Sequence, residues 1–353
     1  MAGRSCLITV AVCLSLALAA CGRGASSTHS RRAHPGSSTT ATRLEAPATS
    51  STTSNVTTSN VTTTRATPLP VPRALIRFAG SAAPARWHPA GRRVHDVPAV
   101  DEAMLVPPGG SRPAGLAWMD TRLLAARLYS GSRSPGGGPY RYTAPVRSGV
   151  ARRLVAAFNG GFMMDAARGG YFTEGRIIDR LRPGGASLVI YAGGSVNVGA
   201  WDTDVRMTPT VVAVRQNLVP LVAGGRPTSR ARSADWQAWG ATCGASSCAA
   251  SVPGIEHQWR SAVGVTPDGA LVYAQGPSLD PLQLASLLVR AGVVRGMELD
   301  INPDWPVFAT YDPIAGHGLA TPINGHLLTA TIRGPDTFFD ASWARDFVTM
   351  SAR

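Results

Sequence analysis

Short apolar runs separated by turn residues dominate the chain from about residue 74 onward. Five of these runs are apolar or alternating and are bounded by Gly, Pro, Asn or Asp, which is typical of β-strands. The five predicted strand regions are 153–159, 187–193, 209–217, 262–274 and 296–301. The region 262–274 predicts a hairpin, because Pro267, Asp268 and Gly269 supply turn chemistry between two apolar arms.

One segment has the periodicity of a helix, with apolar residues at a spacing of about 3.6 between positions 282 and 288. Asp280 can cap this helix, Pro281 suits its first turn and Gly292 ends it. The last residues, 341–353, fit either a strand or a short helix. These elements predict an α+β fold, a mixed β-sheet domain with packed helices.

The N-terminus has a different pattern, in which Arg4 precedes an apolar stretch from Leu7 to Ala20 and then Cys21. This is the layout of a secretory signal peptide, and the stretch is too short to span a membrane stably. The junction 18–21, Leu-Ala-Ala-Cys, matches the lipobox of bacterial lipoproteins, in which the cysteine is acylated after cleavage. The alternative is an ordinary signal peptide with an incidental cysteine. We expect a protein secreted and lipid-anchored to the outer face of the bacterial cell membrane.

Residues 22–73 are dominated by Ser, Thr, Ala and Pro and contain the short repeat TTSNVTTSNVTTT. Such a segment buries too little apolar surface to offset its ordering entropy, so it predicts a disordered stalk. Residues 74–353 are then long enough for one large domain. The expected organisation is therefore a signal peptide at 1–21, a linker at 22–73 and a folded domain at 74–353.

Cysteine usage agrees with an exported protein. Of the five cysteines, Cys6 and Cys13 lie in the predicted signal peptide and Cys21 is the predicted lipid attachment site. The remaining pair, Cys243 and Cys248, predicts a small disulfide loop in an oxidising compartment. A buried pair of free thiols is the alternative.

All 34 basic residues of the chain are arginine, and its formal net charge is +13. From residue 74 onward, 27 arginines stand against 20 acidic residues, so the predicted domain is only moderately basic. The excess is scattered, with no basic run interleaved with aromatic residues, which argues against a nucleic-acid partner. An anionic substrate is compatible with this composition, because arginine suits phosphate.

The stretch AAFNGGFMMD, residues 156–165, places Asn159, Gly160 and Gly161 directly after an apolar run. A glycine pair at that point indicates either a tight turn or a close approach that a β-carbon would block. Asn159 tolerates left-handed backbone and carries an amide that both donates and accepts. A turn that merely ends the strand is the simpler interpretation of the stretch taken alone.

The order of four segments along the chain favours a functional interpretation of this turn. The stretches AAFNGGFMMD, GRIIDRLRPGGASLVIYAGG, WRSAVGVTPDGALVYAQG and LASLLVRAGVVRGMELD resemble the phosphodiester glycosidase family across roughly residues 115 to 350. That family has an asparagine-glycine-glycine-phenylalanine turn, an arginine before a hairpin, and an aspartate that ends a strand after a leucine-rich helix. The chain departs from the family at 299–305, LDINPDW, where the family usually has a run of glycines and serine.

The resemblance implies hydrolysis of a bond between a sugar anomeric carbon and a phosphate in an envelope or exported glycan. It maps Asn159, Gly160 and Gly161 onto the family's turn, with Asn159 orienting a hydroxyl or acetamido group. It maps Arg260 onto a phosphate-binding arginine and Asp300 onto the base or nucleophile. Asn302 in the departing loop completes the predicted substrate-binding set. Because the glycine run is absent, a non-catalytic glycan-binding lipoprotein is the alternative.

Glu298 and Asp300 lie two apart in the same predicted strand, so both are expected on one face as a candidate catalytic pair. If both carboxyl groups were buried together, the pKa of one of them would be raised. The alternative is that one of them is solvated or paired with an arginine such as Arg295. The stretch 300–304, DINPD, also resembles the first half of a calcium loop, but Trp305 stands where such a loop requires glycine. No cofactor is therefore expected.

Overall fold

The computed structural model describes residues 67–70, 85–233, 236–240, 257–313 and 318–353. All of them belong to one compact unit that spans Thr63–Arg353. The predicted signal peptide, most of the predicted linker, and Cys21, Cys243 and Cys248 lie outside the described residues.

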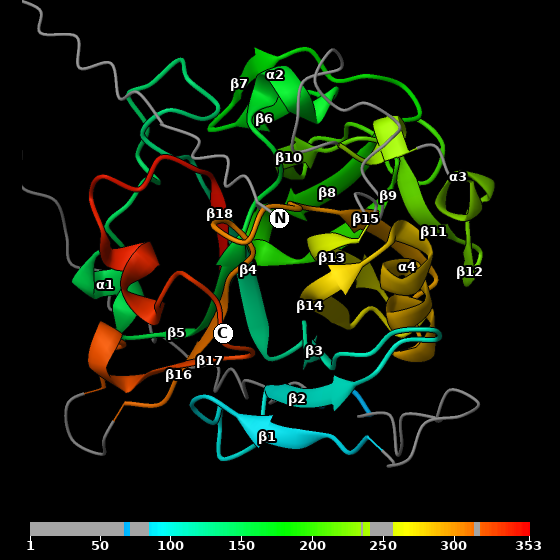
Figure 1. Ribbon diagram of the computed structural model, residues 1–353. Coiled ribbons are helices and arrows are strands. Elements are labelled where there is room, and N and C mark those ends of the chain that lie inside the picture. Colours follow the sequence, from blue (N-terminus) through cyan, green and yellow to red (C-terminus); the bar gives the residue numbers. More distant parts are fainter. Residues whose placement is uncertain (1–66, 71–84, 234–235, 241–256, 314–317) are drawn as a thin grey trace, which may run out of the picture. The chain divides into compact units, whose positions relative to one another are not determined.

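The largest sheet has eight strands in the order β1-β2-β3-β14-β13-β15-β11-β12 (Figure 1). Its strands are β1 (His88–Ala90), β2 (Val100–Leu105), β3 (Ala114–Met119), β11 (Pro220–Ala223), β12 (Arg226–Pro227), β13 (Gln258–Val265), β14 (Leu271–Leu279) and β15 (Arg295–Glu298).

Two further sheets have five strands each. The first, in the order β7-β6-β10-β8-β9, contains β6 (Tyr171–Thr173), β7 (Arg176–Asp179), β8 (Ala186–Tyr191), β9 (Val196–Ala200) and β10 (Val211–Gln216). The second, in the order β17-β16-β5-β18-β4, contains β4 (Leu124–Tyr129), β5 (Leu154–Asn159), β16 (Phe308–Tyr311), β17 (Gly325–Leu327) and β18 (Phe347–Ala352).

Helices are few and short in the described residues. They are α1 (Ser148–Ala151), α2 (Met164–Ala167), α3 (Ser229–Arg232) and α4 (Pro281–Arg290), with 3-10 turns η1 (Ala192–Gly194), η2 (Trp236–Trp239), η3 (Pro322–Asn324) and η4 (Pro335–Phe339). None of the described helices is long and apolar enough to cross a membrane.

The large sheet lies between two layers of apolar side chains, because successive residues of a strand point to opposite faces. On one face, Leu116, Val272 and Ala274 pack with Leu284 and Leu288 of α4. Figure 1 shows α4 lying against this sheet beside β11 and β13. On the other face, residues such as Met119, Tyr273 and Met297 pack against apolar residues of both smaller sheets.

The elements expected from the hydrophobic pattern are confirmed. Each of the five predicted strand regions overlaps an observed strand, although β15 ends at Glu298 and not at 301 as predicted, and 262–274 is part of the β13–β14 hairpin. Asp280 forms a complete capping box with Gln283 and Pro281 begins α4, as expected. The ambiguous segment 341–353 contains a strand, β18, which pairs with both β5 and β4.

The observed domain agrees with the predicted α+β class, but its sheets are not mixed as predicted, because every pairing between the named strands is antiparallel. Leu69, from the segment assigned to the linker, is buried in the core, and its N–H donates to Asp120 Oδ2 at 2.7 Å.

Candidate functional site

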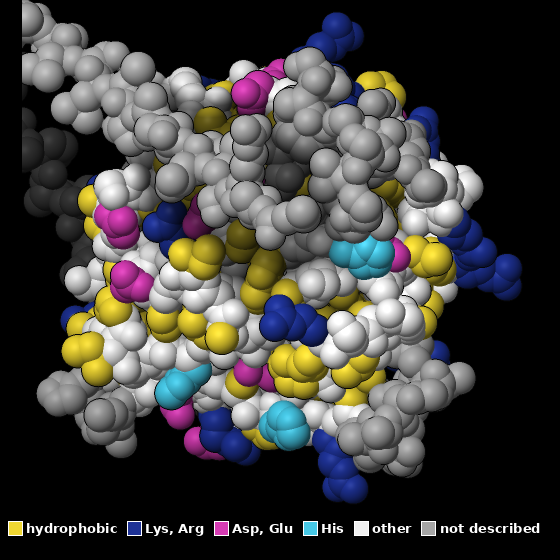
Figure 2. Space-filling model, in the orientation of Figure 1, with side chains coloured by type: hydrophobic (Ala, Val, Ile, Leu, Met, Phe, Trp, Pro, Cys, Tyr) yellow, Lys and Arg dark blue, Asp and Glu magenta, His cyan; other side chains and the backbone are white. Residues whose placement is uncertain are grey.

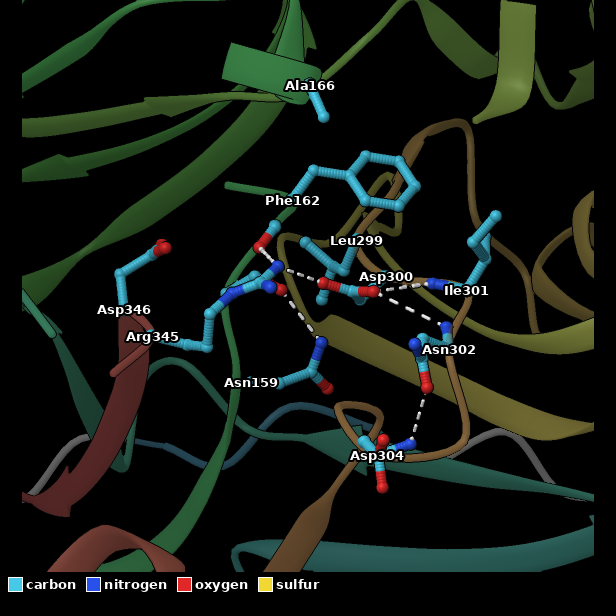
Figure 3. Close-up of polar contacts among 12 residues, drawn as sticks. Asn159, Phe162, Ala166, Leu299, Asp300, Ile301, Asn302, Asp304, Arg345 and Asp346 are labelled. Atoms are coloured by element: carbon cyan, nitrogen blue, oxygen red, sulfur yellow. Dashed lines mark hydrogen bonds and ion pairs between the residues drawn. The ribbon is translucent and has the colours of Figure 1, made fainter. Parts of the chain in front are cut away.

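Two predicted site residues, Asn159 and Asp300, meet where β5 and β15 end (Figure 3), together with Ser261, which the sequence did not single out. Asn159 is the last residue of β5, Asp300 lies two residues beyond β15, and Ser261 lies on β13. The Ser261 hydroxyl accepts hydrogen bonds from Asn159 Nδ2 and from the Asp300 N–H, each at 3.1 Å. The fold thus brings Asn159 and Asp300, 141 positions apart in the numbering, into one hydrogen-bonded group. We call the group formed by Asn159, Ser261 and Asp300 the strand-end centre.

The Asn159 side chain is buried, with 2% of its surface exposed, and both ends of its amide are occupied. Oδ1 accepts hydrogen bonds from Tyr273 Oη at 2.6 Å and from the Val307 N–H at 3.1 Å. Nδ2 donates to the Gly160 carbonyl at 2.8 Å as well as to Ser261. The amide therefore ties β5 to the surrounding strands, and a role in orienting substrate would require it to give up one of these bonds.

The glycine pair is closely approached by side chains of the protein itself. A β-carbon on Gly160 would lie 2.5 Å from Asp346 Cγ and 2.7 Å from the Asp346 carbonyl oxygen. A β-carbon on Gly161 would lie 2.6 Å from Asn217 Oδ1 and 3.0 Å from Arg215 Cζ. Arg215 and Asp346 form a buried ion pair, with Nε and Oδ2 2.8 Å apart. The two glycines thus make room for this ion pair and for Asn217.

Glu298, one of the two predicted catalytic acids, is fully buried and forms an ion pair with Arg260. Arg260 Nη1 donates to Glu298 Oε1 at 2.5 Å, and Arg260 Nε donates to the Leu279 carbonyl at 2.7 Å. Glu298 Oε2 is buried with no hydrogen-bond partner in the described part of the chain. Burial raises the pKa of Glu298 to about 7 despite the opposing effect of Arg260. The predicted phosphate-binding arginine is thus engaged with an acid inside the core.

Asp300, the other predicted acid, pairs with Arg345 near the start of β18. Arg345 Nη2 donates to Asp300 Oδ2 and, at 2.9 Å, to the Gly161 carbonyl. Asp300 Oδ1 accepts from the Ile301 N–H at 2.8 Å. Burial raises the pKa of Asp300 to about 6, although Arg345 and the backbone N–H groups act in the opposite direction. Arginine pairing, the alternative considered for the two acids, therefore occurs at both, but with Arg260 and Arg345. Arg295 instead bonds Asn197 and the Val198 carbonyl.

Unlike Glu298, the Asp300 pair lies directly beneath half-buried residues. Asn302, Asp304 and Trp305, which follow Asp300, are all partly exposed. The guanidinium of Arg345 lies 4.7 Å from the Trp305 ring centroid, a cation–π distance. Of the two Arg345 nitrogens without a hydrogen-bond partner among the described residues, Nε is buried and Nη1 is not. The pair is thus one layer of side chains from the surface. Figure 3 shows Phe162 on one side of Asp300 and Asn159 on the other.

The part of the loop that resembles a calcium site uses its oxygens internally. Asp300 Oδ1 accepts backbone N–H groups, and Asn302 Oδ1 accepts the Asp304 N–H at 3.0 Å. Across the described ranges, no group of three or more His, Cys, Asp or Glu residues is placed to hold a metal ion. Asn302 Nδ2, at the half-buried end of the loop, has no partner among the described residues, so this predicted binding residue is able to donate outward.

Sequence reasoning did not identify Arg345, Asp346 and Arg215 as parts of this region. All three are buried, charged residues: Arg215 lies on β10, and Arg345 and Asp346 immediately precede β18. A detectable signal was the adjacent charged pair Arg345-Asp346 immediately before the apolar strand 347–350, since buried charges are rare unless they are paired.

On the face drawn in Figure 2, the arginine side chains are dispersed and do not form one patch. A cavity of about 840 Å³ lies elsewhere, lined by residues of β4, β8, β10 and the end of β18, and includes none of the predicted site residues. The predicted lipidation site and disulfide lie outside the described residues.

No protein-family model matches the chain, and no curated protein matches it by sequence. Among solved structures, the chain is similar to the catalytic domain of zebrafish N-acetylglucosamine-1-phosphodiester alpha-N-acetylglucosaminidase, which is auto-inhibited by its pro-peptide. The identity is 15% and the TM-score is 0.44, and the match covers 76% of this chain and 88% of that one. A hypothetical protein from Synechocystis has 10% identity and a TM-score of 0.38, covering 77% and 64%. A Burkholderia pseudomallei protein described as exported has 13% identity and a TM-score of 0.35, covering 70% and 74%. These similarities are distant and concern the fold.

Proposed function

We propose that the chain is an exported, lipid-anchored hydrolase of sugar-1-phosphodiester bonds in envelope or exported glycans. In this proposal Asp300 is the catalytic carboxylate and Arg345 binds the phosphate. The observation that carries the proposal is the Asp300–Arg345 pair beneath the half-buried Trp305, because it joins a carboxylate, a guanidinium and an aromatic ring in one place. The lipobox at Cys21 and the resemblance of the ordered segments to phosphodiester glycosidases support export and substrate class.

The proposed reaction breaks the bond between the anomeric carbon and the bridging phosphate oxygen. A water molecule adds its oxygen to the anomeric carbon, the phosphate leaves with the bonding electrons as a phosphomonoester, and Asp300 accepts the proton from water. A phosphomonoester is a good leaving group, so little proton donation to it is needed. Arg345 offsets the negative charge on the phosphate.

Substrate binding would also release the carboxylate from its partner. Arg345 Nη1 is accessible while Nη2 holds Asp300 Oδ2, so an incoming phosphate oxygen can bind the guanidinium from outside. Arginine binds phosphate through two parallel N–H groups, so the phosphate competes with Asp300 for this guanidinium. The half-buried Trp305, whose ring centroid also lies 5.5 Å from the Arg333 guanidinium, is the aromatic side chain assigned to contact the sugar.

A second candidate is a non-catalytic glycan-binding lipoprotein. The specific observation in its favour is that Asp300 is 2% exposed with hydrogen-bond partners on both oxygens. An acid held in this way performs no chemistry unless its ion pair opens. In that case Trp305 and Asn302 would bind glycan at the half-buried edge of the centre.

The test uses a panel of sugar-1-phosphodiesters and measures the release of free sugar by chromatography and binding by calorimetry. If the protein is a hydrolase, Asp300→Asn abolishes turnover but retains binding, and Arg345→Gln weakens both. The control is Arg226→Gln, at an exposed β12 position far along the large sheet. Binding by the unmodified protein without turnover would support the second candidate, and turnover that survives Asp300→Asn would refute the assigned carboxylate.

A further inference from the structure

The cavity of about 840 Å³ is separate from the strand-end centre. It is lined by Ser351, Ala352 and Arg353 at the end of β18, whereas Asn159 pairs with Phe347 at the start of that strand. Ser351, the nearest of these lining residues, is four residues of extended strand from Phe347, or about 13 Å at about 3.3 Å per residue. Any ligand in this groove therefore contacts residues other than those assigned to hydrolysis.

Small side chains leave the space open. Ala125, Ala192, Gly193 and Ala213 line the groove, and Gly194 lies so close to β4 that a β-carbon there would come within 2.6 Å of Ala125 Cβ. The backbone of η1 therefore packs directly against β4 at the bottom of the groove. A larger side chain on this floor would fill the groove or separate the two sheets.

The walls carry a positive charge that the protein does not neutralise. Arg127, Arg141 and Arg153 line the groove, are exposed, and have no ion-pair partner among the described residues. Glu174 is the only acid among the lining residues, and its carboxylate accepts the N–H groups of Arg141 at 3.1 Å and Tyr142 at 2.9 Å. With Arg353, whose guanidinium donates to the Thr121, Leu124 and Gly193 carbonyls, four arginines and one acid line the groove. This balance gives the groove a positive potential that low-dielectric walls strengthen.

Two tyrosines complete the lining. Two guanidinium groups lie near the Tyr142 ring, with Arg127 4.1 Å and Arg141 5.3 Å from its centroid. Tyr191 also lines the groove and is half-buried. Amphipathic rings next to exposed arginines suit a ligand that has both apolar sugar faces and anionic groups.

We propose that this groove is a second binding site, for a polyol chain with anionic groups at regular intervals. Such groups are carboxylates, as in an acidic polysaccharide, or phosphodiesters, as in a polyol phosphate. The arginines bind the anionic groups, and Tyr142 and Tyr191 pack against the chain between them. The site does not depend on the hydrolase assignment, because it shares no residue with the strand-end centre.

The test measures binding of trigalacturonate, of a glycerol phosphate trimer and of uncharged maltotriose by calorimetry at low salt. At least one acidic probe should bind, with maltotriose at least tenfold weaker, and binding should weaken as salt is added. The double variant R127Q/R153Q should weaken the acidic probe about tenfold, since exposed charge pairs contribute about threefold each. The preferred acidic probe would distinguish the carboxylate source from the phosphodiester source.

Two further variants test whether binding needs the open shape of the groove and whether it depends on the arginines of the groove in particular. Val212→Trp places a bulky ring in the groove at an exposed β10 position and should block binding while leaving all arginines in place. Arg226→Gln removes an exposed arginine outside the groove and should leave the affinity unchanged. Repeating the titration in the Asp300→Asn protein keeps this site distinct from the catalytic proposal. Failure of both acidic probes to bind, equal binding of maltotriose, or no effect of R127Q/R153Q overturns the proposal.

Discussion

Gly160→Ala tests whether the glycine pair is required by the protein's own ion pair. The new β-carbon would lie 2.5 Å from Asp346 Cγ and 2.7 Å from the Asp346 carbonyl oxygen, far inside ordinary contact distance. One of these two is a backbone atom, so a side-chain rotation alone does not relieve the clash. Either β5 shifts away from β18, or Asp346 moves and separates from Arg215.

The free-energy costs of these two responses set the expected loss of stability. Overpacking a core costs about 1–3 kcal/mol, and separating a buried ion pair costs about 3–5 kcal/mol because a charge is left without its partner. We therefore expect Gly160→Ala to lower the free energy of unfolding by about 3 kcal/mol. At about 2–4 °C per kcal/mol for a domain of this size, this corresponds to a fall in Tm of roughly 6–12 °C.

Urea denaturation followed by tryptophan fluorescence measures this difference. The matched control is Gly149→Ala, because a β-carbon at this helical position would have no heavy atom within 4 Å. Alanine also forms helices better than glycine, so the control should be unchanged or more stable by up to about 1 kcal/mol. If Gly160→Ala unfolded within about 0.5 kcal/mol of the control, the placement of Asp346 against Gly160 would be wrong.

Three further predictions concern the buried charges and α4. Arg345→Met should cost about 3–5 kcal/mol in urea denaturation by leaving Asp300 buried without its cation, whereas Arg226→Met should have no effect, and equal stability of the two variants would refute the pairing. Because the pKa of Glu298 is raised to about 7 in the folded protein, its contribution to stability is complete below about pH 4.3 and is lost as pH rises through 7. The unfolding free energy should therefore fall by up to about 3 kcal/mol from pH 4 to 8 relative to Glu298→Gln, and an opposite slope would show that the carboxylate is stabilised in its charged form. Asp280→Ala should cost about 1 kcal/mol by removing the cap of α4, and a loss below about 0.3 kcal/mol in thermal unfolding would contradict the capping geometry.

Local signals in the sequence were sufficient to predict the individual strands and the helix α4. The apolar runs located β5, β8, β10, β13 and β15, and the leucine spacing with Asp280 and Pro281 located α4. Alternation and capping act over a few residues, so one chain segment contains all the information they need. The segment 341–353 was ambiguous because its apolar stretch is too short to separate a strand from a helix. Pairing with β4 and β5 decides its conformation.

The charge partners were not predictable in the same way. Arg345 reaches Asp300 across 45 positions, and Arg215 reaches Asp346 across 131, so the pairs depend on the order of strands in the sheets. With arginine so abundant, the sequence offered many candidate partners for each acid. Arg260 was identified as a phosphate ligand from the resemblance, yet in the fold it lies opposite Glu298. The catalytic and binding roles of these residues stay predictions.

The position of β18 makes the last stretch of the sequence essential to the assembly of its sheet. This strand lies between β4 and β5, which occur some two hundred residues earlier. In an incompletely synthesised chain, β4 and β5 would each present an unsatisfied edge to any passing strand. A premature stop or a protease cut shortly before residue 347 would leave that gap permanently open, so aggregation of such fragments is the expected failure of this protein.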